Sequence, residues 1–98
     1  MTVLSFLDVR VRQDALESAP SVISDVLTAT RAFSGSLGVE VVVDVDDPTH
    51  YVLVERWASM DDDDAYRAWR ATPEGASDLG SILAGPPSLV RTVVADGV

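Results

Sequence analysis

The side chains best suited to chemistry gather where one apolar stretch of the chain ends in a charged pair and a tryptophan. Residues 51–59 read Tyr-Val-Leu-Val-Glu-Arg-Trp-Ala-Ser. Alternate side chains of a strand share a face, so four of these residues point the same way: Tyr51, Leu53, Glu55 and Trp57. A carboxyl group beside an indole in an apolar pocket has its charged form disfavoured by desolvation, which is how enzymes tune acids and bases. Glu55 is therefore a candidate catalytic group, unless it pairs with an arginine from a neighbouring strand.

Two further aromatic residues follow on the next segment. Tyr66 and Trp69 are three residues apart, which places them on nearby faces of a helix. A phenol and an indole that reach the same cavity as Trp57 could sandwich a flat aromatic ligand, although core packing is the alternative for each ring alone. The catalytic candidates are Glu55, Arg56 and Tyr66. The candidates for binding a small aromatic substrate are Trp57, Trp69, Tyr51, Phe6 and Leu53.

The composition limits the classes of protein to consider. A chain of 98 residues, 47% of them hydrophobic, suits one folded domain, which we expect to span residues 1–98. The net charge of -9, from 16 acidic residues against 7 arginines, would repel a phosphate backbone, so no nucleic-acid partner is expected. No apolar run approaches the roughly 20 residues of a membrane helix, and no basic, cleavable leader precedes the first strand. We expect no membrane partner and a cytoplasmic location.

Metal and covalent chemistry have few candidates. The chain contains no Cys and no Lys, which removes thiolate nucleophiles, sulfur-ligated metals and Schiff bases. Its one histidine, His50, has no second His or Cys to form a metal site with, so we interpret it as a surface residue. The run from Asp61 to Asp64 lacks the alternating ligands of a calcium loop and is interpreted as a solvated run at a helix start. We expect neither a metal nor a cofactor.

The patterning predicts a ferredoxin-like α+β fold. Strands are expected at residues 3–11, 37–45, 50–58 and 88–95, and helices at 21–33, 59–71 and 74–83. Pro20 suits the first turn of the first helix, and Ser59 followed by Asp62 matches a helix cap. A polar turn at residues 46–49 predicts an antiparallel hairpin. The order β-α-β-β-α-(α)-β corresponds to a four-stranded antiparallel sheet with its helices on one face.

The first two strands are apolar on both sides. Val3, Leu7 and Val9 oppose Leu4 and Phe6, and in the second strand Val39, Val41, Val43 and Val45 flank Val42. Because helices cover only one face, a monomer would leave a large apolar patch in water. We therefore predict a homodimer that packs sheet to sheet, and we expect an Asp at Val41 or Val43, whichever faces the partner, to split it.

The chain resembles the antibiotic biosynthesis monooxygenase (ABM) family over nearly its full length. The resemblance rests on the Glu-x-Trp strand end at Glu55 and Trp57, the helix containing Ala65-Tyr66-Arg67 before Thr72-Pro73, and the Asp-Asp-Pro hairpin turn. It implies a dimeric α+β barrel with a cavity between sheet and helices in each subunit. It also implies cofactor-independent oxidation of an aromatic, polyketide-type metabolite in antibiotic or secondary-metabolite biosynthesis, with Trp57 and Tyr66 at pocket-lining positions.

Two departures from the family pattern leave other functions open. Leu53 stands where anthrone-oxidising relatives carry Asn, and Gly80 stands where they carry Arg. The residues that the haem-degrading branch requires, a His on the later helix and an Asn on the first strand, are absent. One alternative is a redox-neutral polyketide cyclase or isomerase, with Glu55 or Asp8 as general base. The other is a small-molecule-binding dimer without catalysis.

Overall fold

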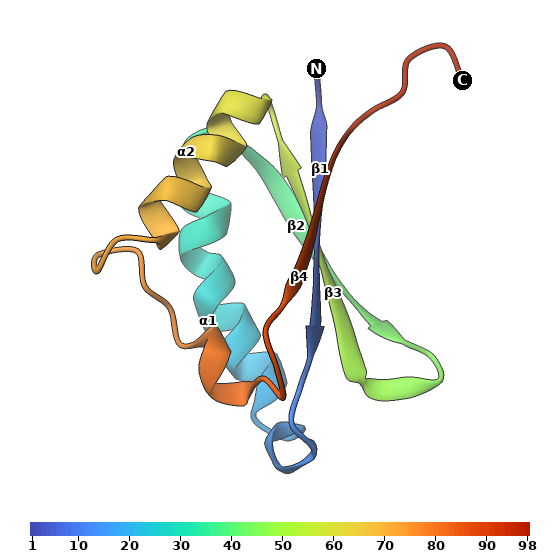
Figure 1. The fold of residues 1–98 in the computed structure, drawn as a ribbon, viewed down its shortest axis with the longest axis vertical. Helices are drawn as coiled ribbons and strands as arrows, with labels where there is room; N and C mark the ends of the chain where they lie inside the picture. Colours follow the sequence, from blue (N-terminus) through green and yellow to red (C-terminus); the bar gives the residue numbers. More distant parts are fainter.

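The structure, a computed structural model, describes residues 1–98 and is built on a four-stranded antiparallel sheet (Figure 1). The strands are β1 (Val3–Arg10), β2 (Ser36–Asp44), β3 (Asp47–Trp57) and β4 (Ser88–Val93). They lie in the order β2-β3-β1-β4, with every neighbouring pair antiparallel. The stretch that carries Glu55 and Trp57 is thus an inner strand, bonded on both sides.

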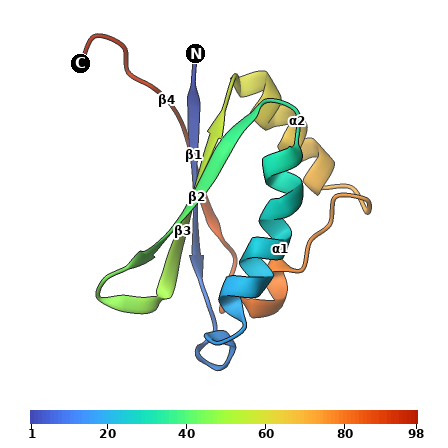
Figure 2. The ribbon, with the colours of Figure 1, turned by 180° about the vertical axis from the view of Figure 1, so that it is seen from behind.

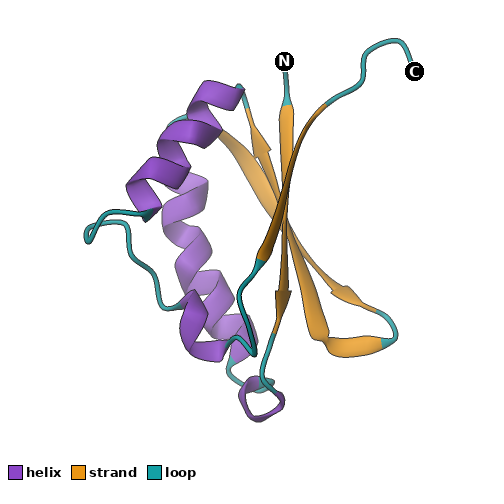
Figure 3. Ribbon diagram, in the orientation of Figure 1, coloured by secondary structure: helices purple, strands orange, loops and turns teal.

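Both α-helices lie on the same side of this sheet, as Figures 1 and 2 show from opposite directions. They are α1 (Ala19–Ala32) and α2 (Met60–Arg70), and two short 3-10 turns, η1 (Gln13–Ala15) and η2 (Leu79–Ile82), complete the helical elements (Figure 3). Pro20 lies in the first turn of α1, where the missing N–H costs no helical bond. No helix has the length and apolarity that crossing a membrane requires. The predicted ferredoxin-like α+β fold is confirmed.

Strand register decides which side chains face the helices. Val3, Ser5 and Val9 of β1 point to the helix side and are buried, as are Leu53, Glu55 and Trp57 of β3. The other face carries a row of paired apolar side chains: Leu4, Phe6, Val42, Val52, Val54 and Val90. We call these six residues the open face. Val41 and Val43 lie on the helix side, opposite Leu53 and Tyr51, so the valine of β2 on the open face is Val42.

The core forms two clusters between the sheet and the helices. The larger cluster joins α1 to β1 and β3 through Ile23, Leu27, Val9 and Leu53. The smaller cluster contains Val3, Trp57 and Tyr66, with Phe33, Met60 and Trp69 packed against it. It lies where β3 ends and α2 begins. The candidate site therefore shares its walls with the core.

The predicted third helix at 74–83 does not form, which corrects the sequence interpretation. Only Leu79–Ile82 makes a 3-10 turn, and the segment before it is loop. Gly75 is buried so close to α2 that an added Cβ would lie 2.0 Å from the carbonyl oxygen of Trp69. Pro73 and Gly75 both disfavour helix, and this contact holds the loop against the end of α2.

Candidate active site

The start of α2 is fixed by the cap that the sequence predicts. Ser59 Oγ accepts a hydrogen bond from the Asp62 amide at 3.1 Å and donates one to Asp62 Oδ2 at 2.9 Å. Gly35, in the turn before β2, has φ 87°, and an added Cβ there would overlap the Asp62 side chain at 2.2 Å. This packing sets the direction in which α2 leaves β3, and so positions the residues of α2 over the sheet.

Glu55 lies buried on the helix side of β3, 1% exposed, where it accepts two hydrogen bonds. Trp57 Nε1 donates to Glu55 Oε1 at 3.1 Å, and Arg67 Nη2 donates to the same oxygen at 2.7 Å. The arginine comes from α2 rather than from a neighbouring strand. Both bonds end on Oε1, so Oε2 has no protein partner.

The acidic run is only partly solvated, which corrects the prediction for Asp63. This carboxylate is 0% exposed and accepts hydrogen bonds from Ser5 Oγ at 2.9 Å and Arg91 Nε at 2.7 Å. Arg67 Nε lies 3.0 Å from Asp63 Oδ1, an ion-pair distance, although neither of these two atoms makes a hydrogen bond. Arg91 also bonds Asp64, and these bonds to Asp64 and Asp63 raise the pKa of Arg91. A chain of alternating charges thus joins β3, α2 and β4.

Tyr66 and Arg70 form a second polar group one helical turn further along α2. The Tyr66 hydroxyl lies 2.7 Å from Thr30 Oγ1 of α1 and accepts a hydrogen bond from Arg70 Nε at 2.8 Å. Arg70 also donates to the carbonyl oxygen of Val26 at 2.9 Å and to that of Gly75 at 3.2 Å. The guanidinium therefore links both helices and the loop.

The aromatic rings pack into one cluster in edge-on and tilted arrangements. Ring centroids lie 4.8 Å apart for Trp57 and Tyr66, and 6.1 Å and 5.5 Å for Phe33 with Trp57 and Trp69. Trp57 is 0% exposed and lines no cavity, so its position corresponds to the core-packing alternative. Tyr66 is the ring of the cluster that reaches the inner cavity.

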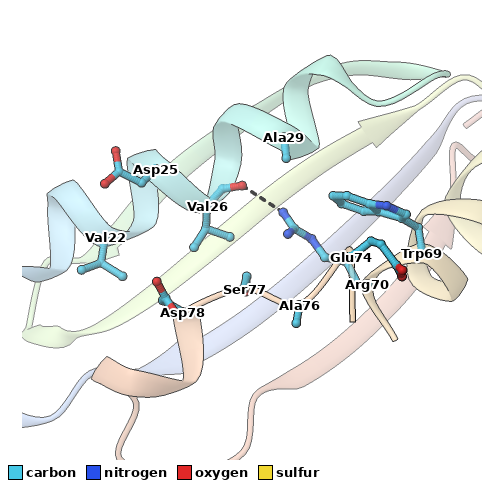
Figure 4. Close-up of a pocket in the computed structure, with 10 residues that line it drawn as sticks. All are labelled: Val22, Asp25, Val26, Ala29, Trp69, Arg70, Glu74, Ala76, Ser77 and Asp78. Carbon is cyan, nitrogen blue, oxygen red and sulfur yellow. Dashed lines mark hydrogen bonds between the residues drawn. The ribbon is translucent and has the colours of Figure 1, made fainter. Parts of the chain in front are cut away.

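Two adjoining hollows lie on the helix side of the sheet, and the sheet lines only the inner one. The inner cavity, of about 180 Å³, lies under α2 and is lined by Leu7, Val26, Leu27, Leu53, Glu55, Tyr66, Arg67, Arg70, Ser77 and Leu79. The outer groove, of about 420 Å³, runs between α1 and the loop after α2 (Figure 4). Its lining includes Trp69, Ala29, Asp25, Glu74 and Asp78. Val26, Arg70 and Ser77 belong to both, so they form the wall between cavity and groove.

The structure brings some of the predicted site residues together and separates others. Glu55, Tyr66 and Leu53 line the inner cavity, and Trp69 lines the groove. Arg56 and Phe6, by strand alternation, lie on the opposite side of the sheet, and Tyr51 lines a separate hollow beside Pro20 and Val41. Asp8, the alternative general base, also faces away from the cavity, because it contacts His50 on the opposite side.

Arg67 and Arg70 are the functional candidates that the sequence interpretation did not propose. Arg67 is four residues after Asp63, and Arg70 is four residues after Tyr66. Residues at this spacing share a helix face, and that was the available signal. It was easily overlooked, because arginines near a helix C-terminus also suit the helix dipole.

His50 has two carboxylate partners on the other side of the sheet. Its Nδ1 lies 2.9 Å from Asp44 Oδ2, and its Nε2 lies 2.7 Å from Asp8 Oδ2. The bond to Asp44, followed by that to Asp8, raises the pKa of His50, and the same histidine lowers the pKa of Asp44. His50, expected as a surface residue, is instead partly buried, with a side chain 18% exposed, and it links β1, β2 and β3 in a charged cluster.

A ferredoxin-like α+β fold with a cavity between sheet and helices defines the class of protein. Within that class the chain belongs to the antibiotic biosynthesis monooxygenase family, whose family model matches residues 4–75. The resemblance inferred from the Glu55-to-Trp57 strand end and the following helix is confirmed. Membership supports a general monooxygenase-like role.

Solved structures of low sequence identity share the fold along nearly the whole chain. Rv0793 from Mycobacterium tuberculosis is 22% identical, with a TM-score of 0.78 over 98% of this chain and 97% of that chain. A protein described as an antibiotic biosynthesis monooxygenase is 17% identical, with a TM-score of 0.78 over 95% and 98%. A conserved protein from Methanosarcina mazei Go1 is 12% identical, with a TM-score of 0.78 over 94% and 91%. No curated protein matches the sequence of this chain.

Proposed function

We propose that this protein is a cofactor-independent monooxygenase that acts on an aromatic, polyketide-type metabolite in antibiotic or secondary-metabolite biosynthesis. The observation that carries the proposal is the inner cavity, which is lined by Glu55, Tyr66, Arg67 and Arg70 and adjoins the aromatic cluster through Tyr66. A carboxylate, a phenol and two guanidinium groups beside the apolar side chains of one pocket suit the formation and binding of a substrate anion.

In such a reaction the substrate supplies the electrons. Loss of a proton from the CH₂ group of an anthrone leaves an electron-rich anion that can reduce O₂ directly. Carbon–oxygen bond formation gives a peroxide, and loss of water from it leaves a carbonyl. The CH₂ group and O₂ thus become C=O and H₂O, with one oxygen atom in each product.

The side chains around the cavity fit the steps that the protein must assist. Glu55 Oε2, which has no protein partner, is the oxygen able to accept the substrate proton. Arg67 holds the other oxygen of this carboxylate and so fixes its orientation. Tyr66, whose hydroxyl is bonded to Arg70, lines the same cavity, and we assign the binding of a substrate oxyanion to this pair.

Oxygen uptake tests this proposal directly. Purified, metal-free protein is mixed with anthrone, oxygen consumption is recorded, and the product is weighed by mass spectrometry after reaction under ¹⁸O₂. We expect consumption above the uncatalysed rate and one labelled oxygen atom in the product. Oxygen consumption no faster than the uncatalysed rate, with anthrone and with a panel of related tricyclic phenols, would refute the proposal.

The free oxygen of Glu55 also favours a second candidate, a redox-neutral cyclase or isomerase. A buried base beside an apolar cavity can remove a proton from an acidic carbon whether or not oxygen follows. Product mass separates the two functions. A gain of oxygen indicates the monooxygenase, whereas an unchanged mass or loss of water indicates the cyclase or isomerase.

We also propose that the working form is a cytoplasmic homodimer joined through the open face. Support comes from the six apolar residues of that face, which no helix covers in the subunit, including Val42, 45% exposed, and Val90, 56% exposed. Burying a second copy against them would remove this apolar surface from water. Each subunit then keeps its own cavity on the helix side of its sheet.

A further inference from the structure

Arg70 is the one arginine that is partly buried without a carboxylate partner. Ion pairs occupy Arg10, Arg12, Arg67 and Arg91. Arg31 and Arg56 have none, but both are exposed to water. Arg70 makes four hydrogen bonds, all to neutral oxygens of Tyr66, Gly75, Val26 and Thr30. A partly desolvated guanidinium with only neutral acceptors retains a positive charge that an anion would satisfy better.

The position of Arg70 makes this charge available to a ligand. The residue belongs to the wall between the inner cavity and the outer groove. Figure 4 shows its guanidinium in the groove between Val26 and Trp69. Its guanidinium carbon lies 4.9 Å from the ring centre of Trp69 and 5.2 Å from that of Tyr66. A flat ligand in the groove would therefore meet the indole and the cation together.

The linings of the two hollows differ in charge, and this difference determines toward which hollow the acidic group of a ligand points. The inner cavity is lined by two arginines, Arg67 and Arg70, and one carboxylate, Glu55. The groove is lined by Arg70 and three carboxylates, Asp25, Glu74 and Asp78. All three carboxylates are exposed, so salt and water screen them. Figure 4 shows Asp25 and Asp78 at the far end from Trp69, and Glu74 beside it.

We propose that Arg70 is an anion subsite, and that the substrate is a flat aromatic compound bearing an acidic group, a carboxylate or an ionised phenol. The aromatic body lies along Trp69 and Ala29 in the groove and extends past Arg70 into the inner cavity toward Glu55, and its acidic group lies against the guanidinium at the wall between the two. Two parallel N–H groups of arginine match the two oxygens of a carboxylate, and an anion there replaces the neutral carbonyl acceptors. This assignment names the substrate class of the proposed monooxygenase site and rests on that proposal.

Two matched ligands test the subsite without any turnover. Anthracene-9-carboxylate and anthracene-9-methanol share the ring system and differ in charge, and calorimetry gives the Kd of each at pH 7.5. We expect the carboxylate to bind at least about tenfold more tightly, as a charge-assisted bidentate bond implies. Equal affinities would overturn the subsite while leaving an aromatic site in place. Failure of both ligands to bind would overturn the aromatic site and the subsite together.

Variants then test whether Arg70 causes the preference for the carboxylate over the alcohol. Arg70→Gln should bring the two Kd values together, and Arg70→Lys, which keeps the charge but not the paired donors, should give an intermediate ratio. Arg31→Gln, an exposed arginine of α1 without a carboxylate partner, is the control and should keep the full preference. Circular dichroism checks folding, and if Arg70→Gln does not fold, the Arg70→Lys ratio decides. A full preference in Arg70→Lys or in folded Arg70→Gln would show that Arg70 only joins the helices.

Turnover separates the subsite from the proposed function. A protein that prefers the carboxylate through Arg70 but consumes no oxygen retains the subsite and loses the monooxygenase assignment. A protein that oxidises anthrone and binds both anthracenes alike retains the monooxygenase assignment and loses the subsite.

Discussion

At the scale of single residues, the hydroxyl of Tyr66 contributes both to the stability of the fold and to the proposed reaction. It bonds Thr30 and Arg70 at 2.7 Å and 2.8 Å in a buried position. Tyr66→Phe leaves both partners short of one bond, which we expect to lower the free energy of unfolding by about 1–2 kcal/mol. Urea unfolding measures this change, and oxygen uptake should fall at the same time.

The matched control for Tyr66→Phe is Tyr51→Phe. Tyr51 is half-buried on the same strand face as Glu55, and its hydroxyl makes no hydrogen bond. We expect an unchanged unfolding midpoint and unchanged oxygen uptake for this variant. A loss of activity as large as that of Tyr66→Phe would argue against a specific role for the Tyr66 hydroxyl.

The buried carboxylate of Glu55 gives a second prediction at this scale. Glu55→Gln keeps the shape but removes the charge that faces Arg67 at 2.7 Å, while Asp63 still neutralises the guanidinium. We expect a loss of about 1–3 kcal/mol in unfolding free energy, together with loss of proton abstraction. Glu17→Gln, at an exposed site between η1 and α1, should change neither. Wild-type turnover by folded Glu55→Gln would exclude this carboxylate as the base.

At the scale of elements, the N-terminus of α2 depends on one serine. Ser59→Ala removes the acceptor of the Asp62 amide and should lower the unfolding free energy by about 1 kcal/mol. Ser24→Ala, an exposed serine on α1 whose hydroxyl makes no hydrogen bond, is the control. Thermal melts of both variants against the wild type give the comparison, and equal melting temperatures for all three would contradict the capping role.

The histidine cluster joins three strands and makes their pairing sensitive to pH. The raised pKa of His50 means that folding favours its protonated form. The hydrogen bond to Asp44 raises the pKa most, the bond to Asp8 comes next, and the positive charge of the neighbouring Arg10 opposes both. Its stabilising contribution is therefore complete below the ordinary value of 6.5 and is lost as pH rises through the higher folded pKa. Asp44, whose pKa is lowered from 3.8, loses its contribution only as pH falls through that lower value.

Proton NMR measures this directly, because the chain has 1 histidine and so one resonance to follow. We expect His50 to titrate above 6.5 in the wild type and closer to 6.5 in Asp44→Asn, where the first of its two carboxylate partners is gone. Asp46→Asn changes a nearby acid that does not contact His50 and should leave the titration unchanged. A wild-type titration at or below 6.5 would contradict the cluster.

At the scale of the whole molecule, the open face determines whether the protein is a monomer or a dimer. Val54 lies at the centre of this face, opposite Phe6 and Glu40. Val54→Asp should split the proposed dimer and destabilise the subunit, because the charge would be buried between two sheets. Val45→Asp places the same charge in the hairpin turn, at a residue 97% exposed, and should leave the dimer intact. Sedimentation velocity compares the three proteins, and a wild-type monomer at micromolar concentration would refute the dimer.

Local patterns in the sequence were sufficient for the elements and for part of the site. Period-two alternation placed Glu55, Trp57 and Leu53 on one face of a strand, and the spacing from Ser59 to Asp62 predicted the start of α2. These features depend on neighbours along the chain, which the sequence contains in full. The helix expected at 74–83 was wrong. Pro73 and Gly75 disfavour helix and were visible in the sequence, whereas the close packing of Gly75 on the Trp69 carbonyl, which holds this segment as a loop, is a feature of the structure.

Contacts between elements decided the rest. Both faces of β1 are apolar, so alternation alone could not predict which face the helices cover. The same holds for β2, where only the packing showed that Val42, and not Val41 or Val43, lies on the open face. Arginine side chains are long and flexible, so sequence could not show that Arg67 reaches Glu55 while Arg70 is left with neutral partners. The burial of Trp57 also depends on contacts between elements. Its strand determines the face on which it lies, but the rings that pack over it come from the end of α1 and from α2.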